Sequence, residues 1–358
     1  TKISNKTVYK KLIGEGAFGI VQLYQCKPEC NDNVCNNCYI VKHLINTSKN
    51  YLGFLSRKDK DRIEKFYQEY EIGILLNHPN IRRTIDIDKK LNCITFENCR
   101  GIDLLDYANE YKIPNTRSLL GYFSQILDAV DYLHNNGIAH LDLKLENIVL
   151  NTCTNVIKLI DFGEASFFKD QQNNNYMFNG IRGIVQYLPP ESVNLTEFQG
   201  DKTDIWCCGI ILYNLFYNYH PWEIAKCSDN KYKIHYFNIT RGLLNQIIFP
   251  KRSEYYTETE WEIIKYLFKT LLNPDPKNRI SINDNSKEKS LELMKETNPV
   301  IIPRNHKVEE ALKAANENNL EVMNKMLSKF DNPYNEQKDI EDYQLPSLDD
   351  NYQTFCGT

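Results

Sequence analysis

The spacing of apolar and polar positions divides the chain into a first part rich in strands and a mostly helical remainder. Four short runs near the start have the residue types and bounds of strands: TVYKKLI (7–13), GIVQLYQC (19–26), CYIVKHLI (38–45) and CITFENC (93–99). Between the third and fourth runs, the apolar residues of the charged stretch 58–76 recur at helical spacing. This pattern predicts a small sheet with one helix beside it.

From about residue 115 onward the pattern is helical. The segment 116–137 is amphipathic and ends on Gly137, which suits a helix C-cap. The segment 204–218, DIWCCGIILYNLFYN, is apolar on all sides and predicts a buried central helix. The polar segment 168–180 is interpreted as a loop. Two short helices are predicted within 308–329, as an ordinary C-terminal extension in preference to half of an ankyrin unit, and a flexible tail follows.

Composition indicates a soluble globular protein, because the 358 residues are 42% apolar and 25% charged. The formal net charge of −4 excludes a surface built to coat nucleic acid or an anionic membrane. No run of 18 apolar residues exists, so we expect no transmembrane segment. Eleven cysteines without a secretory signal favour reduced thiols in an intracellular, cytoplasmic protein. Because the chain opens on Thr1, we expect a fragment or a processed form.

A glycine-rich loop follows the first predicted strand. GEGAFGIV places Gly14, Gly16 and Gly19 just before Val21, and glycines let a backbone turn sharply and approach phosphates. A dinucleotide-binding loop requires a helix directly afterwards, whereas IVQLYQC has the pattern of a strand. Strand–loop–strand is the arrangement of a loop that covers nucleotide phosphates, and on this motif alone a plain glycine turn is the alternative.

The third strand carries Lys42, whose ammonium pairs with nucleotide phosphates when a carboxylate holds it in place. Glu69 and Glu71 are the candidates for that carboxylate. The alternative for any single lysine or glutamate is a solvated surface charge.

The segments HLDLKLENIVL (140–150) and LIDFGEA (159–165) supply the remaining chemistry. Asp142 is placed to accept the proton of an incoming hydroxyl, and Lys144 to neutralise charge on a moving phosphoryl group. Asn147 and Asp161 offer the oxygen ligands that Mg²⁺ prefers, and a strand pair with a turn between them lets both reach one ion. An isolated Asp-Phe-Gly is usually a turn, but the whole ordered set is not explained that way.

With these motifs, the chain resembles a eukaryotic-type Ser/Thr protein kinase over about residues 8–290. The motifs in order are GEGAFGIV, IVK, HPNI, HLDLKLEN, DFG, YLPPE, DIWCCGIILY and DPKNRI. The resemblance implies an α+β fold of two lobes, with a small β-rich N-lobe (1–98), a larger helical C-lobe (99–292) and a C-terminal helical extension and tail (293–358). It implies transfer of the ATP γ-phosphoryl group, with Mg²⁺, to Ser or Thr of a protein substrate.

The resemblance also assigns residues to roles. Spacing from His78 selects Glu69 as the partner of Lys42, with Glu71 as a fallback. Phe96 would be the gatekeeper and Glu97 to Cys99 the hinge. The implied catalytic residues are Asp142, Lys144, Lys42 and Glu69, and the implied metal ligands are Asn147 and Asp161. The implied ATP contacts are Gly14, Glu15, Gly16, Gly19, Val21, Lys42, Phe96, Glu97, Cys99, Asp103 and Val149. Structural roles are implied for a Glu191–Arg279 pair and for Asp204, which would brace the catalytic loop.

The chain departs from the family pattern at Leu141, where an arginine usually pairs with a phosphate on the activation loop. Only Ser166, Tyr176 and Tyr187 carry hydroxyls between Gly163 and Pro189. These observations favour an active kinase that needs no loop phosphorylation; the alternative is a catalytically weak ATP-binding scaffold. Gly73 replaces an apolar side chain and predicts a packing gap, and Ile184 replaces a threonine near the catalytic Asp.

Four cysteines cluster between the second and third strands: Cys26, Cys30, Cys35 and Cys38. Four thiolates suit structural zinc, but only the last two have regular ligand spacing, so free thiols are favoured. A narrower likeness, in EYEIGILLNHPNIRRTIDI and HPWEIAKCSDNKYKIHY, is to fungal kinases that regulate transporters. Besides a protein substrate, a partner for the C-terminal extension is a further hypothesis.

Overall fold

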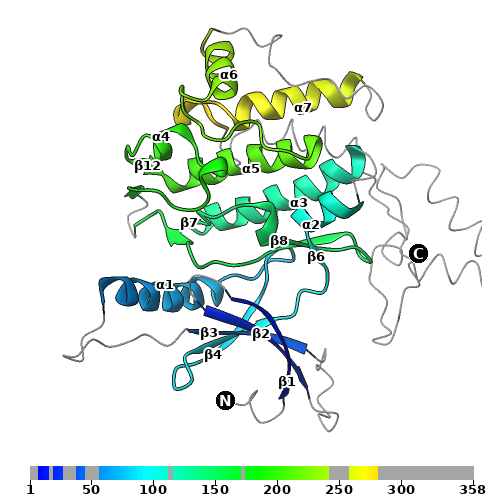
Figure 1. Cartoon of the computed structure of the whole chain (residues 1–358), viewed down its shortest axis with the longest axis vertical. Coiled ribbons are helices and arrows are strands. Elements are labelled where there is room, and N and C mark those ends of the chain that lie inside the picture. Colours follow the sequence, from blue (N-terminus) through cyan, green and yellow to red (C-terminus); the bar gives the residue numbers. More distant parts are fainter. Residues whose placement is uncertain are drawn as a thin grey trace, which may run out of the picture.

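The computed structural model describes residues 7–15, 19–26, 38–44, 56–111, 116–170, 174–241 and 258–280. A five-stranded antiparallel sheet forms one part of the molecule, and a larger helical part stands above it in Figure 1. The predicted α+β kinase fold is confirmed. The Gly16 position, Cys30, Cys35 and the predicted C-terminal helices and tail lie outside the described residues, and the lobe limits stay predictions.

The sheet has the spatial order β1-β2-β3-β5-β4. Its strands are β1 (Thr7–Glu15), β2 (Gly19–Cys26), β3 (Cys38–Leu44), β5 (Cys93–Glu97) and β4 (Thr84–Asp88). Four of these strands were predicted and β4 was not. Strand–loop–strand around the glycine motif is confirmed, because β1 and β2 pair antiparallel on either side of it.

Helix α1 (Arg57–Gly73) lies beside this sheet and buries Phe66, Glu69 and Ile72. Ser56 begins it as an N-cap, because the Ser56 hydroxyl accepts a hydrogen bond from the Asp59 amide at 3.1 Å. The helix ends at Gly73, three residues before the predicted end. The chain then tightens, since the Leu75 amide donates to the Ile72 carbonyl.

The helical part is built around α5 (Gly200–Tyr217), which is buried along almost its whole length, as predicted. Its other elements support that helix or lie between it and the sheet. They are α2 (Leu104–Tyr111), α3 (Thr116–Asn135), α4 (Pro190–Val193), α6 (Asn230–Thr240), α7 (Glu258–Leu271), and the short strands β6 (Ile102–Asp103), β7 (Ile138–Ala139), β8 (Ile148–Asn151), β9 (Val156–Leu159), β10 (Ser166–Phe167), β11 (Met177–Phe178) and β12 (Phe198–Gln199). Among the described residues, no helix is both long and apolar enough to span a bilayer.

The segment 168–180 is not the simple polar loop that the sequence predicted. Phe168 and Phe178 are buried in an apolar cluster with Leu141, Ala139 and Phe198. Strand β11, within the segment, pairs with β12, and β10, directly before the segment, pairs with β7. The polar neighbours of the two phenylalanines concealed this burial, because they break any period in the sequence.

The predicted packing gap at Gly73 is also absent. A Cβ placed on Gly73 would overlap the Thr84 side-chain oxygen, so Thr84 of β4 fills the space where a side chain would project. Glycine is required here by close approach of α1 to the sheet, and not by backbone conformation.

We therefore expect Gly73→Ala to lower the free energy of unfolding by about 1–3 kcal/mol through overpacking. Urea unfolding would measure this. The double variant Gly73→Ala/Thr84→Ala should lose less, because the overlapping oxygen is removed. Gly14→Ala is the control, since a Cβ there meets nothing within 4 Å. A single Gly73→Ala variant as stable as the parent would contradict this packing.

Candidate active site

The centre of the site is the buried ammonium of Lys42, which β3 presents toward α1. Lys42 Nζ lies 2.7 Å from Glu69 Oε2 and 3.0 Å from Asp161 Oδ1. Glu69 comes from α1, and Asp161 follows β9. The structure therefore brings the three predicted groups together, with Glu69 and not Glu71 as the partner of Lys42.

Electrostatics keep Lys42 and Asp161 charged, whereas burial raises the pKa of Glu69 above its ordinary value. Burial lowers the pKa of Lys42, but the carboxylates of Glu69 and Asp161 outweigh it, so the pKa lies above its ordinary value. Burial raises the pKa of Asp161, but Lys42 and then Arg82 outweigh it and hold the pKa at about 2. Asp161 is thus an ionised carboxylate whose side chain is 43% exposed.

A second group of polar side chains surrounds Asp142. Lys144 Nζ donates to Asp142 Oδ2 at 2.7 Å, and Asn147 Nδ2 donates to the same oxygen at 3.1 Å and to the Asp142 carbonyl at 2.8 Å. Among the described residues, none donates a hydrogen bond to Asp142 Oδ1. That oxygen faces Gly183, where a Cβ would approach it to 3.1 Å.

The two groups lie next to each other because the strands β8 and β9 join them. The Ile160 amide donates to the Asn147 carbonyl at 2.8 Å, which fixes Asp161, one residue on, beside Asn147. Asp161 itself has a left-handed backbone with φ of 60°. Non-glycine residues rarely hold this conformation unless their surroundings impose it.

The loop that carries Asp142 is braced from the buried helix α5, as predicted for Asp204. Asp204 Oδ2 accepts from the His140 amide at 2.8 Å, and Oδ1 accepts from the Leu141 amide at 2.9 Å. His134 Nε2 lies 3.0 Å from the same carboxylate. These bonds hold Leu141 in a left-handed conformation, φ 63°, and so set the direction in which Asp142 leaves the loop.

The positions predicted to contact the nucleotide base lie where the sheet joins the helical part. Tyr39 of β3 pairs with Glu97 at the end of β5, and Asp103 of β6 pairs with Val149 of β8. Phe96 is 2% exposed. Asp103 Oδ1 accepts from the Asp106 amide and so caps α2. Burial raises the pKa of the Cys99 thiol to about 11, which leaves it protonated at neutral pH.

The described part of the glycine-rich motif also fits its predicted place. Gly14 pairs with Val21 and Glu15 pairs with Ile20 across the β1–β2 hairpin, and Val21 pairs with Lys42. A Cβ on Gly19 would overlap the His43 carbonyl oxygen, so this position needs glycine for close strand approach.

The oxygen atoms of Asp161 and Asn147 fit Mg²⁺, because this ion does not require a site made of protein ligands alone. Asp161 supplies an ionised carboxylate, and the Asn147 amide nitrogen is taken up by Asp142, which leaves the Asn147 oxygen for a ligand. Mg²⁺ is commonly bound by one or two such groups together with substrate phosphates. Within the described ranges, no group of three or more His, Cys, Asp or Glu side chains is arranged for a metal ion. Cys38 is a free thiol there, and the zinc hypothesis stays a prediction.

One buried residue of the site escaped the sequence analysis. Arg82 precedes β4 and is 9% exposed, with its guanidinium 3.9 Å above the Phe96 ring and 3.8 Å from Glu69 Oε1. Its only signal in the sequence is its position between the buried Ile81 and β4, which does not distinguish it from the exposed Arg83.

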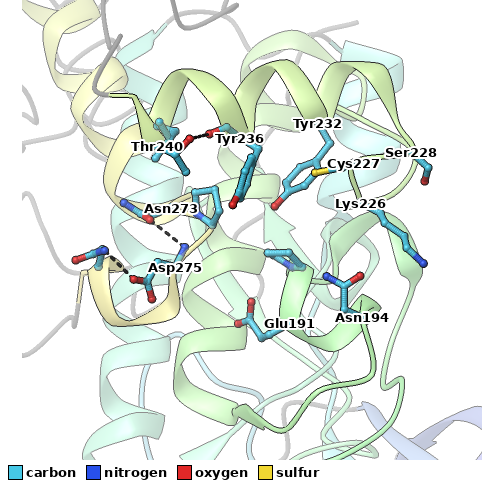
Figure 2. Close-up of a pocket in the computed structure, with 14 residues that line it drawn as sticks. Glu191, Asn194, Lys226, Cys227, Ser228, Tyr232, Tyr236, Thr240, Asn273 and Asp275 are labelled. Atoms are coloured by element: carbon cyan, nitrogen blue, oxygen red, sulfur yellow. Dashed lines mark hydrogen bonds between the residues drawn. The ribbon is translucent and has the colours of Figure 1, made fainter.

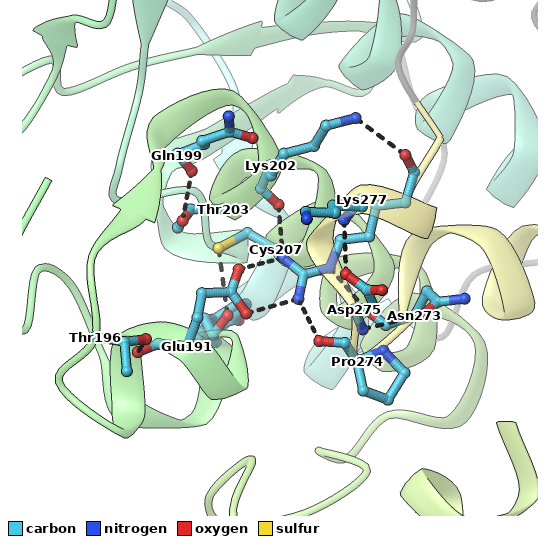
Figure 3. Close-up of polar contacts among 12 residues, drawn as sticks. Glu191, Thr196, Gln199, Lys202, Thr203, Cys207, Asn273, Pro274, Asp275 and Lys277 are labelled. Atoms are coloured by element: carbon cyan, nitrogen blue, oxygen red, sulfur yellow. Dashed lines mark hydrogen bonds and ion pairs between the residues drawn. The ribbon is translucent and has the colours of Figure 1, made fainter. Parts of the chain in front are cut away.

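A separate pocket of about 890 Å³ lies in the helical part and contains none of these groups. In Figure 2, Tyr232 and Tyr236 project from α6 toward Glu191 of α4. Glu191 also forms the predicted pair with the buried Arg279, and the pair is bidentate, at 2.5 and 2.7 Å. Figure 3 shows the contacts that Glu191 makes. Arg279 Nη1 also donates to the Lys202 carbonyl, which ties this pair to α5.

Comparison with known proteins agrees with the geometry. Residues 7–290 match the protein kinase domain family, and the chain belongs to that family. It is 34% identical over 231 residues to the nitrogen permease reactivator protein of Saccharomyces cerevisiae, covering 62% of this chain and 27% of that protein. It is 30% identical over 231 residues to the serine/threonine-protein kinase hal4 of Schizosaccharomyces pombe, covering 63% and 35%.

A third relative is the serine/threonine-protein kinase KIN4 of Saccharomyces cerevisiae, 30% identical over 277 residues, which cover 75% of this chain and 32% of that protein. The aligned parts thus span about a quarter to a third of these three relatives. The predicted resemblance to protein kinases is confirmed, and two of these three relatives are named as serine/threonine-protein kinases.

We expect Arg279→Met to lower the free energy of unfolding by about 3–5 kcal/mol, because Glu191 is left as an unpaired, largely buried charge. Chemical denaturation would measure the loss. The exposed Lys277, two residues away, provides the control, and Lys277→Met should change stability by no more than about 0.5 kcal/mol. A loss below about 1 kcal/mol for Arg279→Met would show that the pair contributes little.

Proposed function

We propose that this chain transfers the γ-phosphoryl group of ATP to Ser or Thr hydroxyls of protein substrates. The observation that carries the proposal is the linked arrangement of Lys42, Glu69 and Asp161 beside Asp142, Lys144 and Asn147. Phosphoryl transfer depends mainly on positioning and on stabilisation of charge, and these six side chains offer both.

Asp142 is the proposed acceptor of the hydroxyl proton. Its Oδ2 is occupied by Lys144 and Asn147, which fix the carboxylate plane, while Oδ1 stays open to a substrate hydroxyl. Lys144 is bonded to Asp142 at 2.7 Å and so places a positive charge next to the transferred group. This arrangement supports general-base catalysis.

Lys42 is the proposed contact for the nucleotide phosphates. Its ammonium is fixed by Glu69 from one side and by Asp161 from the other, so little conformational entropy remains to be lost on binding. Asn147 and Asp161 would hold Mg²⁺, which supplies neutralisation of phosphate charge when it is bound. Phe96, Glu97, Cys99, Asp103 and Val149 would line the base and ribose, with Gly14, Glu15, Gly16, Gly19 and Val21 over the phosphates.

We expect Asp142→Asn to lower kcat for transfer of labelled phosphate to a generic protein substrate by at least about 100-fold, with little change in nucleotide affinity. The loss follows because an amide does not accept the hydroxyl proton. Asp61→Asn, on the exposed side of α1, is the matched control and should retain activity. Equal phosphate incorporation by Asp142→Asn and the parent would defeat the assignment and favour a scaffold or a different base.

We further propose that the active arrangement needs no phosphate on the segment 163–189. Leu141, at the position where the family pattern has an arginine, is 1% exposed and packs with Phe168, Phe178 and Phe198. Apolar burial thus joins the catalytic loop to this segment where a phosphate–arginine pair would otherwise do so. Each buried phenylalanine contributes on the order of 1.5–3 kcal/mol.

Polar contacts to α1 support the same proposal. Lys65 Nζ donates to both carboxylate oxygens of Glu164, at 2.8 and 2.9 Å, and Gln68 Nε2 donates to Ser166 Oγ at 3.0 Å. Both partners lie just after Gly163, and Lys65 and Gln68 share the helix that carries Glu69. The unphosphorylated segment therefore already contacts the helix that positions Lys42.

Phosphatase treatment of the parent protein should leave its rate of phosphoryl transfer unchanged within about twofold.

On the treated protein, Phe178→Ala should lower the rate about tenfold or more, because truncating a buried phenylalanine removes about 3–5 kcal/mol of packing from the segment. Phe237→Ala, on the 40% exposed Phe237 of α6, is the control. Loss of activity in the parent after phosphatase treatment, with phosphate recovered from Ser166 or Tyr176, would refute this part of the proposal.

A further inference from the structure

Arg82 is a second cation within the Lys42 site. Its side chain enters from the start of β4, and its guanidinium lies 3.8 Å from Glu69 Oε1. Glu69 Oε2 is bonded to Lys42, whereas Oε1 is buried and accepts no hydrogen bond from the described residues. The structure thus places the Arg82 guanidinium beside the Glu69 oxygen that Lys42 does not hydrogen-bond.

The charge count of the site gives this contact its significance. Lys42 alone faces two carboxylates, Glu69 and Asp161, which leaves one negative charge in excess around a buried centre. An unpaired buried charge costs several kcal/mol, so the fully buried Glu69, which shares Lys42 with Asp161, requires further compensation. Arg82 supplies a second positive charge, with its guanidinium 3.8 Å from Glu69 Oε1.

Arg82 connects three elements whose relative positions determine the geometry of the site. Its backbone amide donates to the Leu159 carbonyl at 2.9 Å, two residues before Asp161. Its guanidinium covers the face of Phe96 on β5 at 3.9 Å, a distance suited to a cation–π contact. Its charge faces Glu69 on α1. The side chain of Arg82 thus bridges α1 and β5, and its backbone joins both to the end of β9.

We propose that Arg82 is a positioning residue for phosphoryl transfer. It balances the negative charge of Glu69 that Lys42 does not neutralise, and it keeps Glu69, and with it α1, in the nucleotide-binding arrangement. This inference rests on the proposed kinase function. It predicts a specific dependence on the positive charge at this position, since packing on Phe96 alone would be retained by an uncharged side chain of similar length.

The test compares Arg82→Met and Arg82→Gln, which remove the charge, with Arg82→Lys, which keeps it. Affinity for a fluorescent ATP analogue with Mg²⁺ is measured by titration, and KM for ATP, KM for the protein substrate and kcat by initial rates. Both uncharged variants should weaken analogue binding and kcat/KM for ATP about tenfold or more, with KM for the protein substrate within twofold of the parent. Arg82→Lys should recover both nucleotide parameters to within about threefold.

Arg83→Met is the matched control, because Arg83 is the next residue and its side chain is exposed; it should behave as the parent. Uncharged variants that bind the analogue like the parent, or an Arg82→Lys variant no better than Arg82→Met, would overturn the inference. The inference would also be overturned if Arg82→Lys folds but neither uncharged variant does. In that case the fold itself would require the charge.

The binding measurement separates this inference from the proposed function. A parent chain that binds the analogue but transfers no phosphate would refute the function, while the affinities of the variants would still decide the role of Arg82. A parent that does not bind the analogue would overturn both.

Discussion

The buried ion pair between Lys42 and Glu69 is the constraint on which the rest of the site depends. An ammonium in this position is tolerated only because carboxylates from two other elements surround it, and each carboxylate is tolerated because of the ammonium. Strand β3, helix α1 and the segment after β9 must therefore all be in place at once. Gly73 and Thr84 serve the same requirement, because their close contact lets α1 lie near enough to the sheet for Glu69 to reach Lys42.

The part of the site around Asp142 is held in place by a different interaction. Asp204 lies on a helix that is buried along almost its whole length, and its carboxylate fixes two consecutive amides of the loop before Asp142. The position of Asp142 thus depends on hydrogen bonds to a buried helix of the core. The left-handed backbones of Leu141 and Asp161 are consistent with this, since such conformations persist only where surrounding contacts determine them.

The sequence predicted the polar part of the site better than its apolar part. Lys42, Asp142, Asn147 and Asp161 could be chosen because their order along the chain is tied to one chemistry, and the convergence of Asn147 and Asp161 needed only a strand pair and a turn. Strand β4 was missed although its residues, TIDID, alternate polar and apolar, because the run is only five residues long and contains just two apolar residues. The burial of Phe168 and Phe178, the contact between Gly73 and Thr84, and the choice of Arg82 over Arg83 all depend on long-range packing, which no local period records.

The apolar cluster around Leu141 determines how salt and temperature affect the link between the catalytic loop and the segment 163–189. A link made of phosphate and arginine weakens as ionic strength rises, because salt screens charges that are partly exposed. A link made of buried phenylalanines is indifferent to moderate salt and instead loosens on cooling, because hydrophobic association fades at low temperature. The link between the catalytic loop and its neighbouring segment is therefore governed by temperature more than by the electrolyte around it.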